Sequence, residues 1–357
     1  MEEKQTQEKL NDRNVDRYGE PVIPSVLKAE IPLSEASKRT VMGARQEIRD
    51  ILDGKDRRKI VISGPCSVHD LEACVEFAER FLKLKKEVSS ELLLIQRAYF
   101  EKPRTTVGWK GLIYDPDIDG SYQLAKGLKI AREYLNRVTS MGMPCATEFL
   151  GVITPQYIGE MISWAAIGAR STENQDHRRM ASGLSMPVGF KNGTSGDIGI
   201  AIDAVAAARA KDMFVGINEN GQACPVYTGG NRYGHVVLRG GNGKPNCHPE
   251  TINKTLELLT SKGLPRNLIV DCSHGNSEKN HYKQKEVAYM ILEQMLTGTD
   301  GIVGIMLEAH LNEGKQNEPT NRKELDNLKY GVSITDSCID WQTNEDIIRE
   351  YARRLRK

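Results

Sequence analysis

Hydrophobic residues along this chain gather in short runs separated by longer stretches of mixed polarity. The eight runs are Ile60–Ser63, Leu92–Ala98, Cys145–Leu150, Trp164–Ala169, Pro187–Phe190, Val236–Leu238, Leu268–Cys272 and Ile302–Leu307. They are nearly continuous in apolar residues, which is typical of parallel strands buried on both faces. Amphipathic stretches follow them, and several end at a glycine such as Gly142 or Gly263. Eight strand–helix units close a barrel, so the pattern predicts a (β/α)8 TIM barrel, an α/β fold.

The first 35 residues lie outside this alternation. They are charged and weakly periodic, and we expect residues 1–35 to form an N-terminal arm that makes regulatory or subunit contacts rather than core. A helix is expected next, because the 3.6-residue spacing places five apolar residues on one face. These are Val41, Ala44, Ile48, Ile51 and Leu52, and Gly54 stands where such a helix would end. We assign the catalytic barrel to residues 36–357.

One passage interrupts the alternation before the sixth strand. Two β-rich runs, Phe214–Asn218 and Ala223–Thr228, flank N-E-N-G-Q, which has the chemistry of a hairpin turn. We therefore expect an inserted antiparallel hairpin at residues 213–230. The glycines of R-G-G-N-G-K-P at 239–245 lack the Ser or Thr of a phosphate-binding loop, so they give only weak support for a nucleotide site.

Composition narrows the class of protein. In 357 residues, 49 Lys and Arg balance 48 Asp and Glu, which disfavours nucleic acid as the main partner. The mean hydropathy is −0.47, and no run approaches the roughly 20 apolar residues of a membrane helix, so no membrane partner is expected. The polar start lacks the apolar segment of a secretion signal, and the 7 cysteines are scattered. Both features favour a cytoplasmic protein with reduced thiols.

Ionisable or metal-binding residues stand just after each apolar run. In chain order they are Cys66, Arg97, Glu148, Arg170, Lys191, Arg239, His274 and Glu308. Active sites of barrels form at the carboxyl ends of the strands, so these side chains are expected to face a common centre. One charged residue at a loop start would be ordinary, but eight together favour a functional site.

These residues divide into two chemical groups. The cations are Arg97, Arg170, Lys191 and Arg239, joined by Lys102 and Arg104 from the loop after the second strand. So many cations in one place need anions, which predicts a site for more than one phosphate or carboxylate. The metal-ligand types are Cys66, His274, Glu308 and, beyond the last strand, Asp336. This mixed set suits a first-row divalent ion and differs from a structural zinc site, where Cys and His dominate.

Five longer motifs lie at these strand ends. They are G-P-C-S-V-H-D (64–70), K-P-R-T-T-V-G-W-K-G (102–111), G-F-K-N-G-T (189–194), D-C-S-H-G-N-S (271–277) and Y-G-V-S-I-T-D (330–336). Together they closely resemble class I 3-deoxy-D-arabino-heptulosonate-7-phosphate (DAHP) synthases, and the second motif is highly specific. The resemblance runs from about residue 30 to the C-terminus. It implies a metal-dependent transferase that condenses phosphoenolpyruvate with erythrose 4-phosphate, the first step of the shikimate pathway to chorismate and the aromatic amino acids.

The resemblance also implies roles for individual residues. The implied metal ligands are Cys66, His274, Glu308 and Asp336, with Mn²⁺, Fe²⁺ or Co²⁺ as the metal. The implied contacts of phosphoenolpyruvate are Arg97, Lys102, Ala169, Arg170, Lys191 and Arg239. Arg104 and Thr105 match the erythrose 4-phosphate site. Lys102 and Glu148 are the expected catalytic residues, the first in proton transfer and the second in orienting the attacking water.

Feedback inhibition in a homodimer or homotetramer is a further implication of the resemblance. The arm, the hairpin and the loop after Glu148 would form the effector pocket at a subunit interface. Its expected residues are Gly151, Leu184, Ser185, Phe214 and Gly216. Gly216 stands where the phenylalanine-sensitive type carries serine, which leaves volume for a phenol, so tyrosine is the expected inhibitor. Gly151 stands where relatives usually carry an aspartate that helps to hold the effector, so weak to moderate inhibition is expected.

Two other functions remain open. A related 8-phosphate synthase joins phosphoenolpyruvate to arabinose 5-phosphate, but the K-P-R-T-T loop and the long arm disfavour it. A non-catalytic sensor of sugar phosphates on a decayed barrel is disfavoured by the intact set of metal-ligand types, which a sensor does not need.

Overall fold

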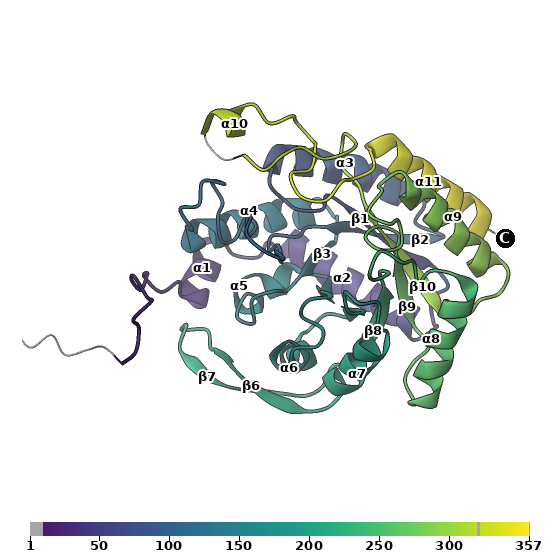
Figure 1. The fold of residues 1–357 in the computed structure, drawn as a ribbon, viewed down its shortest axis with the longest axis horizontal. Helices are drawn as coiled ribbons and strands as arrows, with labels where there is room; N and C mark the ends of the chain where they lie inside the picture. Colours follow the sequence, from purple (N-terminus) through teal and green to yellow (C-terminus); the bar gives the residue numbers. More distant parts are fainter. Residues whose placement is uncertain (1–9, 320–321, 357) are drawn as a thin grey trace, which may run out of the picture.

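Eight parallel strands close into a barrel in the order β1-β10-β9-β8-β5-β4-β3-β2 (Figure 1). The structure is a computed structural model that describes residues 10–319 and 322–356. The barrel strands are β1 (Lys59–Gly64), β2 (Leu92–Arg97), β3 (Cys145–Glu148), β4 (Trp164–Ile167), β5 (Val188–Lys191), β8 (Gly234–Leu238), β9 (Leu268–Asp271) and β10 (Ile302–Glu308). Each overlaps one of the eight apolar runs, so the predicted (β/α)8 barrel is confirmed.

Helices cover the outside of the barrel (Figure 1). The longer ones are α2 (Glu35–Leu52), α3 (Leu71–Glu87), α4 (Leu124–Ser140), α6 (Gln175–Gly183), α7 (Gly199–Ala208), α8 (Pro249–Ser261), α9 (Lys283–Leu296) and α11 (Trp341–Leu355). Shorter helical segments are α1 (Pro24–Glu30), α5 (Pro155–Ile158), η1 (Gly159–Met161) and α10 (Arg322–Asp326). None of the helices in the described part of the chain has the length and apolar character needed to cross a membrane.

The helix α2 illustrates how local sequence sets an element. The Ser34 side chain accepts a hydrogen bond from the Ser37 backbone N–H and so caps the first turn. The five apolar residues predicted to share a face are all buried. Gly54 follows the helix at φ 72°, the left-handed conformation that ends helices and that glycine adopts without strain.

Alternate residues of most barrel strands belong to two different hydrophobic clusters. In β1, Ile60 and Ile62 belong to the cluster inside the barrel, whereas Val61 belongs to the outer cluster between the strands and the helices. This is the two-residue period of a strand with both faces buried, and it explains why the apolar runs are continuous.

A buried Trp–His pair lies inside the barrel. Trp164 Nε1 donates to His235 Nε2 over 3.0 Å, and His235 Nδ1 lies 3.1 Å from the Tyr233 carbonyl oxygen. These partners fix a neutral imidazole with its proton on Nδ1. Burial lowers the pKa of His235 to about 4. Gly189 makes room for the indole, because a Cβ there would lie 2.3 Å from the Trp164 ring.

The predicted hairpin is confirmed as β6 (Asp212–Ile217) and β7 (Ala223–Thr228). It is inserted between α7 and β8, and in Figure 1 it runs along the outside of α6 and α7. The barrel strands on either side of the insertion, β5 and β8, pair directly with each other. The Asn231 N–H donates to the Ala208 carbonyl over 2.8 Å, so the chain returns to the barrel where it left.

The described part of the expected arm has two structural parts. Residues 10–21 are exposed. The helix α1 is instead held against the body: Leu27 is buried in the outer hydrophobic cluster, and Lys28 Nζ lies 2.7 Å from a carboxylate oxygen of Glu219 in the hairpin turn. The expectation that this whole segment stays out of the core therefore does not hold for α1.

Candidate active site at the carboxyl ends of the strands

The ionisable residues predicted at the strand ends surround one mouth of the barrel. Arg97, Glu148, Lys191 and Glu308 end β2, β3, β5 and β10, and Arg239 directly follows β8. Cys66, Arg170 and His274 lie two or three residues beyond β1, β4 and β9. A cavity of about 630 Å³ opens here. Its lining includes Arg97, Lys102, Arg104, Thr105, Glu148, Ala169, Arg170, Lys191, Arg239, His274, Glu308 and Asp336.

Glycines allow the loops of this rim to pack tightly. A Cβ at Gly241 would lie 2.1 Å from the Gly196 nitrogen, and one at Gly240 would lie 2.4 Å from the Gly275 carbonyl carbon. The R-G-G-N-G segment, which forms the loop after β8, therefore packs against the loops after β5 and β9. Below it, the Asn192 side-chain oxygen accepts from the Arg239 N–H over 2.8 Å, which positions Arg239 at the cavity.

Three of the four predicted metal ligands form one cluster. Ligand atoms of Cys66, Glu308 and Asp336 all lie within 4.8 Å of one another. His274 lies beside this cluster, with Nε2 3.7 Å from Glu308 Oε1. A thiol, two carboxylates and a neighbouring imidazole are the ligand types of a first-row divalent ion, so the residues fit such a metal.

The ammonium of Lys102 lies against this cluster. Lys102 Nζ donates to Cys66 Sγ over 3.1 Å and to the Cys66 carbonyl oxygen over 3.0 Å. Burial, with Glu308 nearby, raises the pKa of the Cys66 thiol to about 11. Burial alone would lower the pKa of Lys102, but Cys66, Glu308 and Asp336 outweigh it and raise that pKa above its usual value. Two carboxylates and a thiol thus lie close together beside one ammonium group.

Arg97 is buried between Glu308 and an aromatic ring. Its Nη2 lies 3.0 Å from Glu308 Oε1, and its guanidinium carbon lies 3.9 Å from the centre of the Tyr99 ring. Ser273 Oγ donates to the other Glu308 oxygen over 2.8 Å. Burial would raise the pKa of Glu308, but His274, Arg97 and Lys102 hold it below its usual value. Tyr99 also lines the cavity, and we did not predict it.

Asp271 is a buried acid that the sequence analysis missed. Its Oδ2 accepts from Lys191 Nζ over 3.1 Å and lies 2.9 Å from His274 Nδ1. Despite burial, His274 and Lys191 hold the pKa of Asp271 well below its usual value. Asp271 thus orients both a predicted substrate contact and a predicted metal ligand. The available signal was a carboxylate at the end of the apolar run L-I-V-D.

The outer part of the cavity holds Arg104 and Thr105. Arg170 Nη2 donates to Thr105 Oγ1 over 3.1 Å, which joins the two loops that carry them. Gly108 has φ 142°, and a Cβ there would lie 2.7 Å from Arg104 Nε, so the guanidinium lies against the Gly108 backbone. Glu318, from the segment after β10, lies 2.5 Å from Arg104 Nη2 and was also missed.

Glu148 lies at the inner end of the cavity and is 7% exposed. A Cβ at Gly168 would lie 2.1 Å from Glu148 Oε1, so a larger residue there would displace this carboxylate from its observed position. The next residues, Ala169 and Arg170, line the cavity. The end of β4 is therefore shaped around Glu148.

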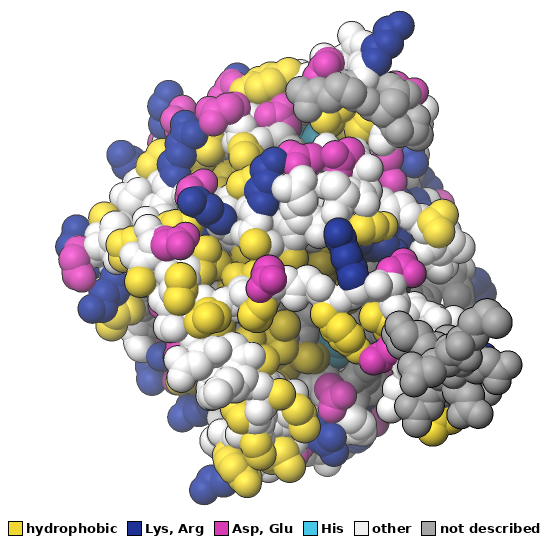
Figure 2. Space-filling model, turned by 90° about the vertical axis from the view of Figure 1, so that its left-hand side faces the viewer, with side chains coloured by type: hydrophobic (Ala, Val, Ile, Leu, Met, Phe, Trp, Pro, Cys, Tyr) yellow, Lys and Arg dark blue, Asp and Glu magenta, His cyan; other side chains and the backbone are white. Residues whose placement is uncertain are grey.

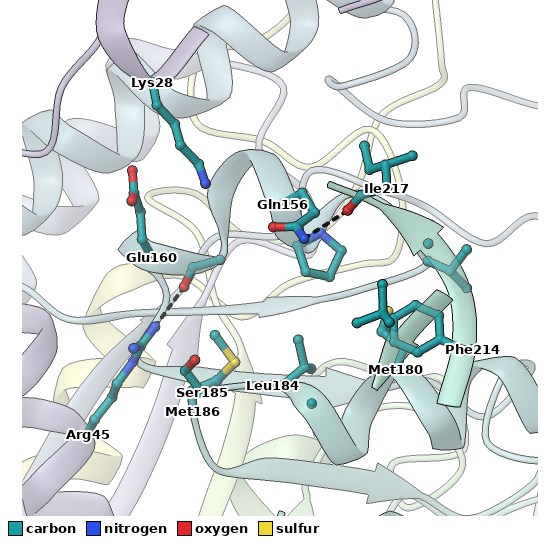
Figure 3. Close-up of a pocket in the computed structure, with 16 residues that line it drawn as sticks. Lys28, Arg45, Gln156, Glu160, Met180, Leu184, Ser185, Met186, Phe214 and Ile217 are labelled. Atoms are coloured by element: carbon teal, nitrogen blue, oxygen red, sulfur yellow. Dashed lines mark hydrogen bonds between the residues drawn. The ribbon is translucent and has the colours of Figure 1, made fainter. Parts of the chain in front are cut away.

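A second cavity of about 280 Å³ lies among α1, α5, α6 and the hairpin. Four of the five predicted effector residues line it: Leu184, Ser185, Phe214 and Gly216. Figure 3 shows Lys28, Arg45 and Glu160 on one side, and Phe214, Met180 and Leu184 on the other. The cavity therefore combines charged groups with an apolar wall, and only part of that wall was predicted.

Gly151, the fifth predicted effector residue, does not line this cavity. Its N–H donates over 2.9 Å to Oε1 of Glu101, a buried carboxylate, and the Leu150 N–H donates to Oε2 over 3.1 Å. Glu101 precedes Lys102 in the chain, and Val152 lines the second cavity. Through its hydrogen bond to Glu101, Gly151 thus links the loop that carries Lys102 at the first cavity to Val152 at the second cavity.

The fold and this rim define a class of protein: a (β/α)8 barrel enzyme with a cationic cavity and a cluster of metal-ligand types at the carboxyl ends of its strands. The profile of the DAHP synthetase I family matches residues 30–349. The Tyr-sensitive phospho-2-dehydro-3-deoxyheptonate aldolase of Salmonella typhimurium is 49% identical over 93% of this chain and 92% of its own length. The chain therefore belongs to the DAHP synthetase I family, which confirms the resemblance.

Two further comparisons agree with this assignment. The Trp-sensitive phospho-2-dehydro-3-deoxyheptonate aldolase of Enterobacter agglomerans is 46% identical over 97% of this chain and 98% of its own length. The structure of phospho-2-dehydro-3-deoxyheptonate aldolase from Francisella tularensis matches with a TM-score of 0.93 and 43% identity, over 96% of this chain and 99% of that chain. Relatives with different effectors are thus almost equally similar, so identity alone does not select the effector.

Proposed function

We propose that the protein condenses phosphoenolpyruvate with erythrose 4-phosphate and water to give DAHP and inorganic phosphate. One observation carries the proposal: six cations and the three-residue ligand cluster meet at one mouth of the barrel. The cations are Arg97, Lys102, Arg104, Arg170, Lys191 and Arg239. Two phosphates and a carboxylate are the kind of anions that such a set of cations binds.

The cations divide between the two substrates. One group, with Arg170, Lys191 and Arg239, holds the carboxylate and phosphate of phosphoenolpyruvate, and Ala169 lies beside Arg170 in the chain. Arg104 and Thr105, on the outer side, hold the phosphate of erythrose 4-phosphate. Two anchored phosphates align C3 of one substrate with the aldehyde carbon of the other, which is an orientation effect.

Cys66, Glu308, Asp336 and His274 would hold a divalent metal, with Mn²⁺, Fe²⁺ and Co²⁺ as the expected ions. The metal supplies Lewis-acid polarisation of the aldehyde oxygen. His274 can approach the cluster through Nε2, since Nδ1 faces Asp271. A carboxylate on the far nitrogen is the usual support of a ligating imidazole.

Lys102 and Glu148 carry the proton transfers. C3 of phosphoenolpyruvate forms the new carbon–carbon bond, and the Lys102 ammonium gives a proton to the aldehyde oxygen as it gains charge. The C2 centre left behind is cationic and is captured by water that Glu148 orients. The resulting hemiketal phosphate loses inorganic phosphate by cleavage of its C–O bond, which leaves the ketone of the product.

The test is phosphate release with Mn²⁺, phosphoenolpyruvate and either aldose. Release with erythrose 4-phosphate and little with arabinose 5-phosphate is expected. The reverse preference would establish the 8-phosphate synthase activity instead. No release with either aldose, with both sugars still bound, would leave the sensor function.

We also propose that tyrosine inhibits the enzyme from the second cavity. Charged groups such as Lys28 and Glu160 suit the charged ends of an amino acid, and Phe214 suits an aromatic side chain. A Cβ at Gly216 would lie 2.9 Å from a Val226 methyl and 3.1 Å from the Phe214 ring. Glycine at this position thus supports a larger effector such as tyrosine. In this proposal the arm (residues 1–35) and the inserted hairpin (residues 213–230) regulate the catalytic barrel, which spans residues 36–357 and contains that hairpin.

We further propose that the protein forms a homodimer or homotetramer and is located in the cytoplasm. Figure 2 shows hydrophobic side chains spread over the side of the molecule that lies to the left in Figure 1. On the outer face of the hairpin, Met213, Val215 and Tyr227 are 42%, 72% and 81% exposed, which supports a subunit contact there. All seven cysteines are free thiols, which supports a reducing compartment.

A further inference from the structure

Glu318 holds the position on Arg104 that an anionic ligand would take. Its Oε1 lies 2.5 Å from Arg104 Nη2, and its Oε2 accepts from the Trp109 N–H over 3.0 Å. A guanidinium and a backbone N–H around one carboxylate form the usual geometry of an anion site. The carboxylate comes from the segment after β10, remote in sequence from the loop that carries Arg104.

On the Arg104 side of this contact, both donors also contact other residues of their own loop. The guanidinium lies against the backbone of Gly108, where a Cβ would lie 2.7 Å from both Nε and Nη2. Trp109 is anchored in turn, because its Nε1 donates to the Asp115 carbonyl oxygen over 2.7 Å. Both donors thus have contacts within their own loop besides those with Glu318.

The Glu318 side is exchangeable. Arg104 and Glu318 side chains are each 25% exposed, so water and solutes reach the pair. Lys279 and Lys315 also line the cavity and are exposed. A phosphate dianion entering the cavity is attracted by these further cations, whereas the Glu318 carboxylate that it replaces can turn to solvent.

We propose that Glu318 is an internal competitor for the phosphate of the second substrate, an inference that rests on the proposed function. In the free enzyme Glu318 occupies Arg104 and the Trp109 N–H. The phosphate of erythrose 4-phosphate displaces it, and the apparent affinity is reduced by the fraction of molecules in which Glu318 is bound. A partly exposed ion pair contributes up to about 1 kcal/mol, which corresponds to a reduction of about fivefold.

The experiment compares Glu318→Gln with Glu313→Gln, a control on the same segment whose exposed carboxylate lies 4.0 Å from His281 Nε2. In Glu318→Gln the KM for erythrose 4-phosphate is expected to fall by about threefold to fivefold. The inhibition constant of inorganic phosphate, measured in competition with erythrose 4-phosphate, is expected to fall by a similar factor. The KM for phosphoenolpyruvate should stay within twofold, and Glu313→Gln should match the wild type in all three values.

The possible results separate the two proposals. An unchanged or raised KM for erythrose 4-phosphate in Glu318→Gln, with an active wild type, overturns the role of Glu318 alone. A raised value would show that Glu318 orders the Arg104 loop for binding instead of competing with the ligand. A wild-type enzyme without turnover of phosphoenolpyruvate and erythrose 4-phosphate contradicts the proposed function itself. Glu318→Ala, which removes the side chain altogether, is expected to change the same constants in the same direction.

Discussion

Cys66 is a buried thiol whose pKa is raised to about 11, first by burial and then by the nearby Glu308 carboxylate. Such a thiol carries its proton at neutral pH, and a thiolate is the form that binds a metal. Metal binding must therefore release a proton, and we expect it to become tighter as the pH rises. The single residue thus links metal content to pH.

Replacing Cys66 or His274 with alanine is expected to remove bound Mn²⁺ and to lower turnover at least about 100-fold, because the ligand set is broken. Metal content after dialysis and phosphate release measure the two effects. Cys224→Ala, at a half-buried cysteine of the hairpin, serves as the control and should keep its metal. Wild-type turnover that persists after exhaustive EDTA treatment would contradict the metal requirement.

A second prediction at this scale concerns His235 and acid stability. Burial lowers its pKa to about 4 in the folded protein, whereas an unfolded histidine titrates near 6.5. Between these values the unfolded chain binds a proton that the folded chain does not, so stability falls as the pH falls. The expected loss from His235 is about 1.5 kcal/mol between pH 6.5 and pH 5.

Urea unfolding at the two pH values tests this effect. His235→Gln keeps an acceptor for the Trp164 N–H but does not titrate, so its unfolding free energy should change less between them than that of the wild type. His248→Gln, at an exposed histidine, should keep the wild-type difference. An equal difference in wild type and His235→Gln would mean that His235 is protonated in the folded protein.

At the scale of elements, the barrel explains which parts of the site were predictable. The apolar runs predicted all eight strands, because both faces of each strand are buried. Topology then brings the strand ends together, so residues far apart in sequence such as Cys66 and Glu308 were placed in one site. The helix α1 was missed, because seven residues with two buried positions give no periodic signal.

Other features depend on contacts that no local pattern encodes. Glu318 meets Arg104 across 214 positions of sequence, and nothing around it marks it as part of the site. Gly151 was assigned to the effector cavity by the resemblance, since relatives carry an effector-binding aspartate at this position, yet its N–H donates to Glu101. Such placements follow from loop packing in three dimensions.

The division of cations between strand-end loops leads to a third prediction. Arg170→Ala is expected to raise the KM for phosphoenolpyruvate, and Arg104→Ala that for erythrose 4-phosphate, each by about tenfold to a hundredfold. Charge-assisted contacts of one loop act on one substrate, so the other KM should change much less. Steady-state kinetics with each substrate varied in turn measure both constants. Equal effects of either variant on both substrates would show that the loops act as one unit.

The hairpin leads to a fourth prediction. Gly216→Ser places an oxygen-bearing side chain against Phe214 and Val226 in the second cavity, so the tyrosine concentration for half inhibition should rise at least about fivefold. Gly229→Ser is the matched control, because a Cβ at Gly229 meets nothing within 4 Å. Deleting residues 1–30 removes Lys28 from the cavity and should weaken inhibition as well. Stronger inhibition of the wild type by phenylalanine than by tyrosine would refute the assignment.

At the scale of the whole molecule, the exposed apolar face of the hairpin predicts self-association. Light scattering should give a mass two or four times the 39.8 kDa of one chain. Val215→Glu places a charge on the face that also carries Met213 and Tyr227, and should shift the mass toward one chain. Met42→Glu, at a 60% exposed residue of α2, is the control. A wild type with the mass of one chain would exclude this contact.

The hairpin leaves the barrel at Ala208 and returns at Asn231, and the N–H of one donates to the carbonyl of the other. The strands β5 and β8 pair with each other regardless of what lies between these two residues. In evolutionary terms, the segment is an insertion whose two ends lie side by side. Its length and sequence can therefore diverge without changing the register between β5 and β8. The residues that line the cavity at the strand ends lie outside it. Under the proposed regulation, changes in this segment would alter the preference for the effector while the residues proposed for catalysis stay the same.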